Sequence, residues 1–170
     1  MMDKPATVSE KVGRVLVVDD DEDVLQAARL LLKQHFALVH TETRPERLPS
    51  LLQNERYDVI LLDMNFARDV SSGEEGFYWL EKTLAADPSA VIVLITAFGD
   101  VDLAVRAIKA GATDFVLKPW QNEKLLATLS AAMRLRQSNE QARVLTERQQ
   151  HLVETLDPPL SEFIGVCPAI

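Results

Sequence analysis

The chain has 170 residues, of which 26 are acidic and 18 basic, and its hydrophobic content is 47%. This size and composition suit one compact domain of about 100–150 residues with an appendage. The net charge of −8 offers no positive surface for phosphate backbones, so we expect no direct nucleic-acid binding by this segment. The single cysteine, Cys167, excludes an intrachain disulfide, and no Cys/His cluster offers the ligands of a structural zinc site.

The hydropathy of the chain gives no indication of a membrane segment. No apolar run approaches the roughly 18–20 residues that span a bilayer. Residues 1–10 are mostly polar and lack the hydrophobic centre of a signal peptide. We therefore expect a soluble, unexported protein in the reducing cytoplasm, without membrane contact.

Short apolar runs alternate along the chain with helix-like stretches. The runs are rich in Val, Ile and Leu, which is typical of strands buried on both faces. They are residues 15–18, a weaker edge run at 36–39, and residues 59–62, 90–95 and 115–117. The helix-like stretches between them are residues 24–33, 48–55, 77–86 and 101–110. Repeated βα units predict an α/β fold, a doubly wound parallel sheet whose ligand site lies at the carboxyl ends of the strands.

A long helix is predicted after this alternating region. It begins near Asn122 and meets no glycine or proline before Pro158. Eight residues follow one another at alternating four- and three-residue steps, and six of them are apolar, as in a coiled-coil seam. They are Ala131, Leu135, Ser138, Ala142, Leu145, Gln149, Leu152 and Leu156. Because Ser138 and Gln149 interrupt the seam, a solvated linker helix is the alternative interpretation.

Polar side chains stand at the ends of the core strands. Asp19 and Asp20 follow the first run, and Asp63 follows residues 59–62. Thr96 and Lys118 follow the two later runs. Carboxylates, a hydroxyl group and an ammonium group are the groups needed to hold a phosphoryl group during in-line transfer. Asp63 is the candidate acceptor.

The three carboxylates also predict a metal site. Two unit charges about 4 Å apart repel by about 4 kcal/mol at an effective dielectric constant near 20, so such a cluster requires a cation. Magnesium takes a few oxygen ligands and keeps several waters, whereas calcium needs a fuller cage. We therefore expect Mg²⁺. Asp21, Glu22 and Asp23 are interpreted as the cap and first turn of the following helix.

With these strand-end residues, the sequence resembles the receiver domain of bacterial two-component response regulators. The resemblance covers about residues 12–135 and rests on four motifs. They are Val15-Leu-Val-Val-Asp-Asp20, Ile60-Leu-Leu-Asp63, Ile95-Thr-Ala97 and Phe115-Val-Leu-Lys-Pro119. It implies a flavodoxin-like five-stranded sheet in the order 2-1-3-4-5 and a phosphoacceptor regulatory domain that is not an enzyme beyond its own phosphorylation and slow dephosphorylation.

The same resemblance assigns roles to residues. Asp63 would be phosphorylated by a sensor histidine kinase, and Lys118 would contact the phosphoryl group. Thr96 and Phe115 would be the switch residues that signal phosphorylation, and Lys118-Pro119 would be a cis peptide. Magnesium would be held by Asp19 through water, by Asp20 and Asp63, and by the backbone carbonyl of Asn65.

One stretch departs from the family pattern. Most receivers have a glycine about eight residues after the acceptor, whereas the matching glycine here is Gly76. The loop after Asp63 would thus be about five residues longer than usual, which affects the mouth of the pocket.

The long helix and the ending Phe163-Ile-Gly-Val-Cys-Pro-Ala-Ile170 resemble the junction before the AAA+ ATPase domain of sigma-54-dependent, NtrC-like transcription activators. No G-x-x-x-x-G-K-[ST] phosphate-binding loop occurs in the chain, so the ATPase and DNA-binding domains would lie outside it. Four regions follow from the two resemblances. They are a disordered segment at 1–11, the receiver at 12–135, a linker or coiled coil at 136–157, and the start of the ATPase domain at 158–170.

Three other classes of protein share some of these sequence features. A haloacid-dehalogenase-like phosphatase needs a second aspartate two residues after the nucleophile, where this chain has Asn65. A dinucleotide-binding domain needs a glycine-rich turn after the first strand, where residues 19–23 are all acidic and would repel a pyrophosphate. A receiver-like interaction module that acts without phosphorylation remains the alternative.

Overall fold

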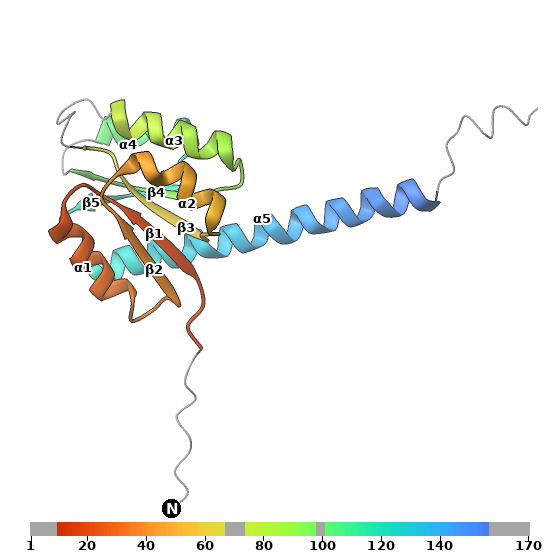
Figure 1. Cartoon of the computed structure of the whole chain (residues 1–170), viewed down its shortest axis with the longest axis horizontal. Coiled ribbons are helices and arrows are strands. Elements are labelled where there is room, and N and C mark those ends of the chain that lie inside the picture. The colour runs from red at the N-terminus through yellow and green to blue at the C-terminus, as the bar shows by residue number, and fades with distance from the viewer. Residues whose placement is uncertain (1–9, 67–73, 98–100, 157–170) are drawn as a thin grey trace, which may run out of the picture. The chain divides into compact units, whose positions relative to one another are not determined.

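The computed structural model describes residues 10–66, 74–97 and 101–156. The chain divides into two compact units, residues 1–136 and residues 137–170 (Figure 1). Among the described residues, no helix combines the length and the apolar character needed to cross a membrane.

The first unit is built on a five-stranded parallel sheet. Its strands are β1 (Arg14–Val18), β2 (Leu38–Glu42), β3 (Val59–Asp63), β4 (Ile92–Ala97) and β5 (Asp114–Lys118). The strand order is β2-β1-β3-β4-β5, and every neighbouring pair is parallel. The predicted α/β fold class and strand order are therefore confirmed.

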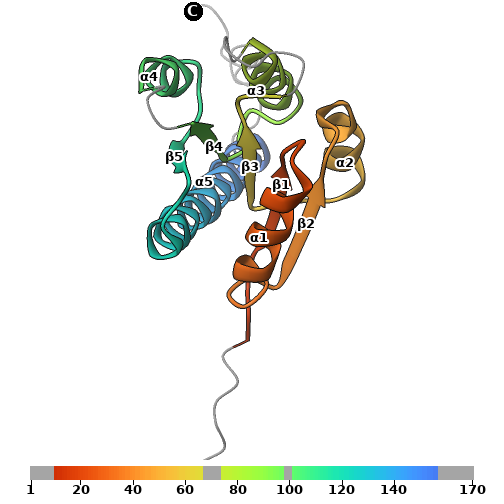
Figure 2. The same ribbon diagram turned by 90° about the vertical axis from the view of Figure 1, so that its left-hand side faces the viewer.

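Helices connect the strands and cover both faces of the sheet. They are α1 (Glu22–Leu32), α2 (Leu48–Asn54) after the short 3₁₀ turn η1 (Pro45–Arg47), α3 (Glu74–Ala86), α4 (Val101–Lys109) and α5 (Asn122–Leu156). Figures 1 and 2 show α2, α3 and α4 on one side of the sheet, with α1 and the first part of α5 on the other. The predicted long helix from Asn122 is confirmed.

The two faces of the sheet form two apolar layers because successive strand residues point to opposite sides. Val15, Val17 and Leu61 face Leu25 of α1 and Leu129 of α5 in one layer. In the other layer, inward strand residues pack with side chains from α2, α3 and α4. They include Leu16, Ile60, Leu62, Leu94, Leu48, Leu80 and Ala107. Burial on both faces explains the continuous apolar runs of the central strands.

Several element boundaries differ from the sequence prediction, and three of the differences concern the edge strand, α3 and the polar strand ends. The edge strand runs over Leu38–Glu42 instead of 36–39, because Phe36 is buried in the turn before it and Arg14 pairs with Leu38. Helix α3 begins at Glu74, three residues before the predicted start. The polar residues predicted to follow the later strands belong to them, since Thr96 pairs with Leu117 and Ala97 with Lys118.

The described side chains of the second unit, residues 137–155, belong to α5. All of them are exposed except Glu140, which is half-buried. Leu145 and Leu152 of the predicted seam are 59% and 54% exposed. Predicted segments 1–11 and 158–170 fall mainly or wholly outside the described residues.

Candidate functional site

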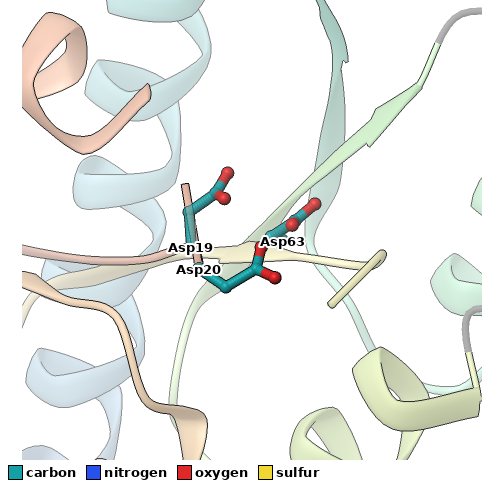
Figure 3. Close-up of side chains that lie close together, drawn as sticks. All are labelled: Asp19, Asp20 and Asp63. Carbon is teal, nitrogen blue, oxygen red and sulfur yellow. The ribbon is translucent and has the colours of Figure 1, made fainter. Parts of the chain in front are cut away.

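Three aspartates meet where β1 and β3 end. These strands are adjacent and parallel, with Val18 opposite Leu62, so the residues that follow them come out at the same edge of the sheet. Carboxylate oxygens of Asp19, Asp20 and Asp63 lie within 4.8 Å of one another. Figure 3 shows the three side chains gathered at this edge. The structure thus brings together the three carboxylates that the sequence singled out.

The cluster is shielded from solvent to different degrees. Asp19 is fully buried, Asp63 is 1% exposed, and Asp20 is half-buried. The pKa of the Asp63 carboxyl is raised to about 7, first by burial and then by the negative charge of Asp19. Burial also raises the pKa of Asp19, against the opposing effect of its contacts with Lys118 and the Asp21 amide. The raised pKa values show that the surroundings compensate these negative charges incompletely.

Lys118 supplies a cation to this cluster from the end of β5. Its Nζ lies 2.6 Å from Oδ2 of Asp19 and 3.2 Å from Oδ1 of Asp63. Burial by itself would lower the pKa of Lys118, but its bonds with the two carboxylates outweigh that effect and raise the pKa. The peptide bond between Lys118 and Pro119 is cis, as the resemblance implied.

Among the residues that the structure describes, three carboxylates and one ammonium lie together at this edge. The raised pKa of Asp63 indicates that burial and the charge of Asp19 disfavour its charged form. Carboxylate oxygens are the donors that a hard divalent ion prefers. The buried donor set therefore fits Mg²⁺, which Asp19, Asp20 and Asp63 would hold.

Acidic residues after Asp20 have the structural role predicted for them. Asp21 is the N-cap of α1, and its side chain accepts hydrogen bonds from the backbone amides of Asp23 and Val24. Glu22 and Asp23 lie in the first turn of that helix. The Asp21 amide in turn donates to Oδ1 of Asp19 at 2.9 Å. The backbone amide of the capping residue therefore fixes one oxygen of Asp19, a candidate metal ligand.

The two residues assigned as switches lie on the same face of the sheet. Thr96 is fully buried near the end of β4, and its hydroxyl donates a long hydrogen bond of 3.4 Å to the carbonyl of Ala97. Phe115 in β5 is half-buried and pairs with Leu94, two residues before Thr96. Because side chains two positions apart in a strand share a face, Thr96 and Phe115 both face the α4 side.

The backbone after Asp63 passes close to α3. The amide of Asn65 donates to Oδ1 of Asp63 at 3.2 Å. A Cβ atom on Gly76 would lie 2.7 Å from both the Cα and the carbonyl oxygen of Met64, so this helix position requires glycine. This close approach agrees with Gly76 as the family glycine. The lengthened loop itself lies largely outside the described residues.

A groove beside Lys118 was not predicted as a feature. It has a volume of about 490 Å³ and is lined mainly by apolar atoms of α1 and of the segment after β5. Its lining residues are Asp23, Val24, Ala27, Lys118, Pro119 and Trp120. Trp120 packs against the core layer of α1 and α5.

Comparisons with known proteins agree with this geometry. Residues 15–130 match the model of the response regulator receiver domain. The chain belongs to this family. It is 30% identical over 161 residues to the alginate biosynthesis transcriptional regulatory protein AlgB of Pseudomonas aeruginosa, covering 93% of this chain and 35% of AlgB.

Solved structures show the same fold. The signal receiver domain of a response regulator from Bacteroides fragilis is 46% identical, with a TM-score of 0.66 over 72% of this chain and 98% of that one. NtrX from Brucella abortus is 21% identical and has a TM-score of 0.71 over 82% of this chain and 30% of NtrX. This chain thus spans about a third of the length of AlgB and of NtrX.

Proposed function

We propose that this receiver is controlled by phosphorylation of Asp63, with a sensor histidine kinase as the phosphoryl donor. The observation that carries the proposal is the buried carboxylate of Asp63, which lies beside the Lys118 ammonium and close to the partly exposed Asp20. A carboxylate with a raised pKa, beside a fixed cation and other metal-type donors, is suited to attack phosphorus.

In the transfer step, a carboxylate oxygen of Asp63 forms a bond to phosphorus. The bond between phosphorus and the imidazole nitrogen of the donor histidine breaks, and its electron pair stays on that nitrogen. Lys118 holds its positive charge beside the oxygens that gain negative charge. Mg²⁺, held by Asp19, Asp20, Asp63 and the carbonyl of Asn65, would neutralise charge on the phosphoryl oxygens. No separate substrate is turned over, so the domain is a phosphoacceptor and not an enzyme in the usual sense.

Thr96 and Phe115 would report the modification. The hydrogen bond from the Thr96 hydroxyl to the Ala97 carbonyl is long and therefore weak. The hydroxyl would lose little free energy if it donated to a phosphoryl oxygen instead. A move of Thr96 would free space on the α4 side for Phe115. Phosphorylation can shift a two-state equilibrium only through such differential contacts.

We infer a multidomain transcription regulator around this chain. AlgB is a transcriptional regulatory protein that matches over 93% of the chain. This match and the resemblance of residues 163–170 to an NtrC-like junction favour a sigma-54-type ATPase and a DNA-binding domain beyond the chain, with a cytoplasmic location. Residues 12–135 would be the receiver and residues 136–157 the linker.

The linker would pair two copies of the chain. Leu135, Leu145 and Leu152 of the predicted seam are all more than 40% exposed, so the apolar stripe is uncovered in one copy. Isolated helices draw little stability from propensity alone and need packing. Pairing through this stripe would bury it in both copies and give a homodimer.

Mass spectrometry after treatment with acetyl phosphate tests the proposal. With Mg²⁺, the wild-type chain should gain one phosphate, whereas Asp63→Asn should gain none and keep its circular-dichroism spectrum. Asp102→Asn on the exposed face of α4 is the matched control and should label normally. Equal labelling of Asp63→Asn, or labelling unaffected by excess chelator, would contradict the proposal and favour a module that acts without phosphorylation of this site.

A further inference from the structure

A second cluster of charged side chains, one of them buried, lies near the start of β4. Arg136 of α5 is 5% exposed. Its Nη2 donates to Oδ2 of Asp87 at 2.9 Å, and its Nη1 donates to the hydroxyl of Ser89 at 2.8 Å. The Ser89 hydroxyl and amide both donate to Oδ1 of Asp87. Both terminal nitrogens of the guanidinium therefore bind the same turn, Asp87-Pro88-Ser89.

The hydrogen bonds of this cluster are directional, whereas the apolar contacts between α5 and the sheet are not. Leu125, Leu129 and Met133 pack in an apolar layer, where small slides of a helix change the packing energy gradually. The planar fork of an arginine meets two acceptors only within a narrow range of positions. Although burial alone raises the pKa of Asp87, the hydrogen bonds from Arg136 and Ser89 outweigh burial and lower it. The cluster thus fixes the register of this helical turn.

The sequence position of each partner connects the cluster to the phosphorylation site. The Asp87–Ser89 turn lies between α3 and β4. Strand β4 carries the proposed switch residue Thr96 one position before its end, and α3 carries Gly76, which approaches the backbone of Met64 beside Asp63. Among the α5 side chains that the structure describes, Arg136 is the last one that is buried. Compact unit 1 ends at this same residue.

We propose that Arg136, Asp87 and Ser89 form a latch that holds the last buried turn of α5, and that phosphorylation-dependent shifts of α3 and β4 pass through it into α5. The coupling part rests on the proposed function. Packed elements with defined alternative positions can carry such coupling between distant sites. Arg136 acts through the helix and is a positioning residue.

Hydrogen–deuterium exchange of the full chain, read on peptides covering residues 125–136 and 137–155, tests the latch. Arg136→Met keeps an unbranched stem but removes the fork. Without phosphate, it should exchange about tenfold faster over residues 129–136 than the wild type. Arg134→Met is the matched control, since Arg134 lies two residues earlier on the exposed side of the same helix and its replacement should leave exchange unchanged. Unchanged exchange in Arg136→Met would overturn the latch.

The coupling is tested on samples labelled with acetyl phosphate, with the amount of phosphate measured by intact mass. Labelling should change the exchange of α5 peptides in the wild type and in Arg134→Met. It should not do so in Arg136→Met, even though Asp63 is labelled equally. The same phosphorylation response in Arg136→Met, or no response in labelled wild type, would overturn the coupling.

Failure of the proposed function can be distinguished from failure of the latch. A wild type that fails to label contradicts the proposed function and, with it, the coupling, while the unphosphorylated comparison still decides whether the latch exists. Ser89→Ala removes a single partner of Nη1 and is the milder variant if Arg136→Met does not fold. It should exchange faster than the wild type over residues 129–136, and unchanged exchange in that variant would contradict the latch.

Discussion

The surroundings of Asp63 and of Asp87 shift the pKa of a carboxyl group in opposite directions. At Asp63, burial and the negative charge of Asp19 raise the pKa to about 7. At Asp87, a guanidinium and a hydroxyl saturate the carboxylate and lower its pKa. A carboxylate saturated by hydrogen bonds fixes the geometry of its partners, whereas a buried carboxylate with a raised pKa is suited to take up a cation or a phosphoryl group. The difference separates a charge cluster that positions a helix from one that is suited to bind a charged ligand.

The largest effect is expected from removal of the Lys118 cation beside Asp63. Lys118→Met should lower the initial rate of labelling by acetyl phosphate about 100-fold, since a fixed charge beside the transferring group is lost. Rates from intact mass spectrometry at saturating Mg²⁺ provide the measurement. Lys109→Met, at the exposed end of α4, is the control and should react like the wild type. Equal rates for both variants would show that Lys118 does not contact the reacting group.

The same Asp-to-Asn change should have opposite effects on stability in the two clusters. In chelator at pH 8, Asp63→Asn should raise the free energy of unfolding by about 1 kcal/mol or more, because it removes a poorly compensated charge. Asp87→Asn should lower it by about 1–2 kcal/mol, because it weakens charge-assisted hydrogen bonds that are partly exposed. Urea denaturation followed by circular dichroism measures both. Effects of the same sign would show that the two clusters do not differ as described.

The two carboxyls should also act in different pH ranges. An unfolded aspartate has a pKa of about 3.9. Asp63, with a folded pKa of about 7, binds more protons in the folded state, so its contribution to stability falls as pH rises from about 4 to 7. The folded pKa of Asp87 is lowered, so its stabilisation is complete above about pH 4 and is lost as pH falls through the folded pKa.

Denaturation curves in chelator across this pH range test the assignment. Relative to the wild type, Asp63→Asn should flatten the decrease in stability between about pH 4 and 7. Asp87→Asn should lower stability by a constant amount there and approach the wild type at lower pH. An unchanged slope in Asp63→Asn would mean that this carboxyl does not titrate with a raised pKa.

A smaller effect is expected at Thr96. Thr96→Ala should leave Asp63 able to accept phosphate but reduce the backbone amide chemical-shift changes in α4 and β5 on labelling. The expected loss is one hydrogen bond, worth about 1 kcal/mol of the switching free energy. Identical shift changes in the labelled variant and the wild type would show that the hydroxyl is not the switch.

The smallest effect is expected from the seam, because Ser138 and Gln149 interrupt it. Leu145→Asp and Leu152→Asp should weaken self-association, measured by sedimentation equilibrium of the full chain. Arg143→Asp, also on the exposed helix but off the seam, is the control. If the leucine variants associate like the wild type, the helix does not hold the dimer.

Much of this fold could be predicted from the sequence because the central strands are buried on both faces. Continuous apolar runs marked them, and the topology of a parallel sheet placed Asp19, Asp63 and Lys118 at one edge. The edge strand was misplaced by two residues because its position depends on pairing with β1. The apolar character of Phe36 reflects burial in a turn rather than strand pairing.

The latch could not have been predicted in the same way. Arg136 and Asp87 are 49 residues apart, and each looks like an ordinary surface charge in its own segment. The apolar seam lies on the exposed face of the long helix and gives no information on the buried face, where Arg136 lies. A contact between two charged residues far apart in sequence leaves no periodic pattern to read.

Mapping the phosphate within the chain is the most direct test of Asp63 as the acceptor. Borohydride reduction of the labelled protein converts a phosphoaspartate to homoserine, which peptide sequencing by mass spectrometry locates. We expect homoserine at position 63 alone, and only when Mg²⁺ was present during labelling. Homoserine at position 19 or 20, or at position 63 after labelling in excess chelator, would contradict the proposed site.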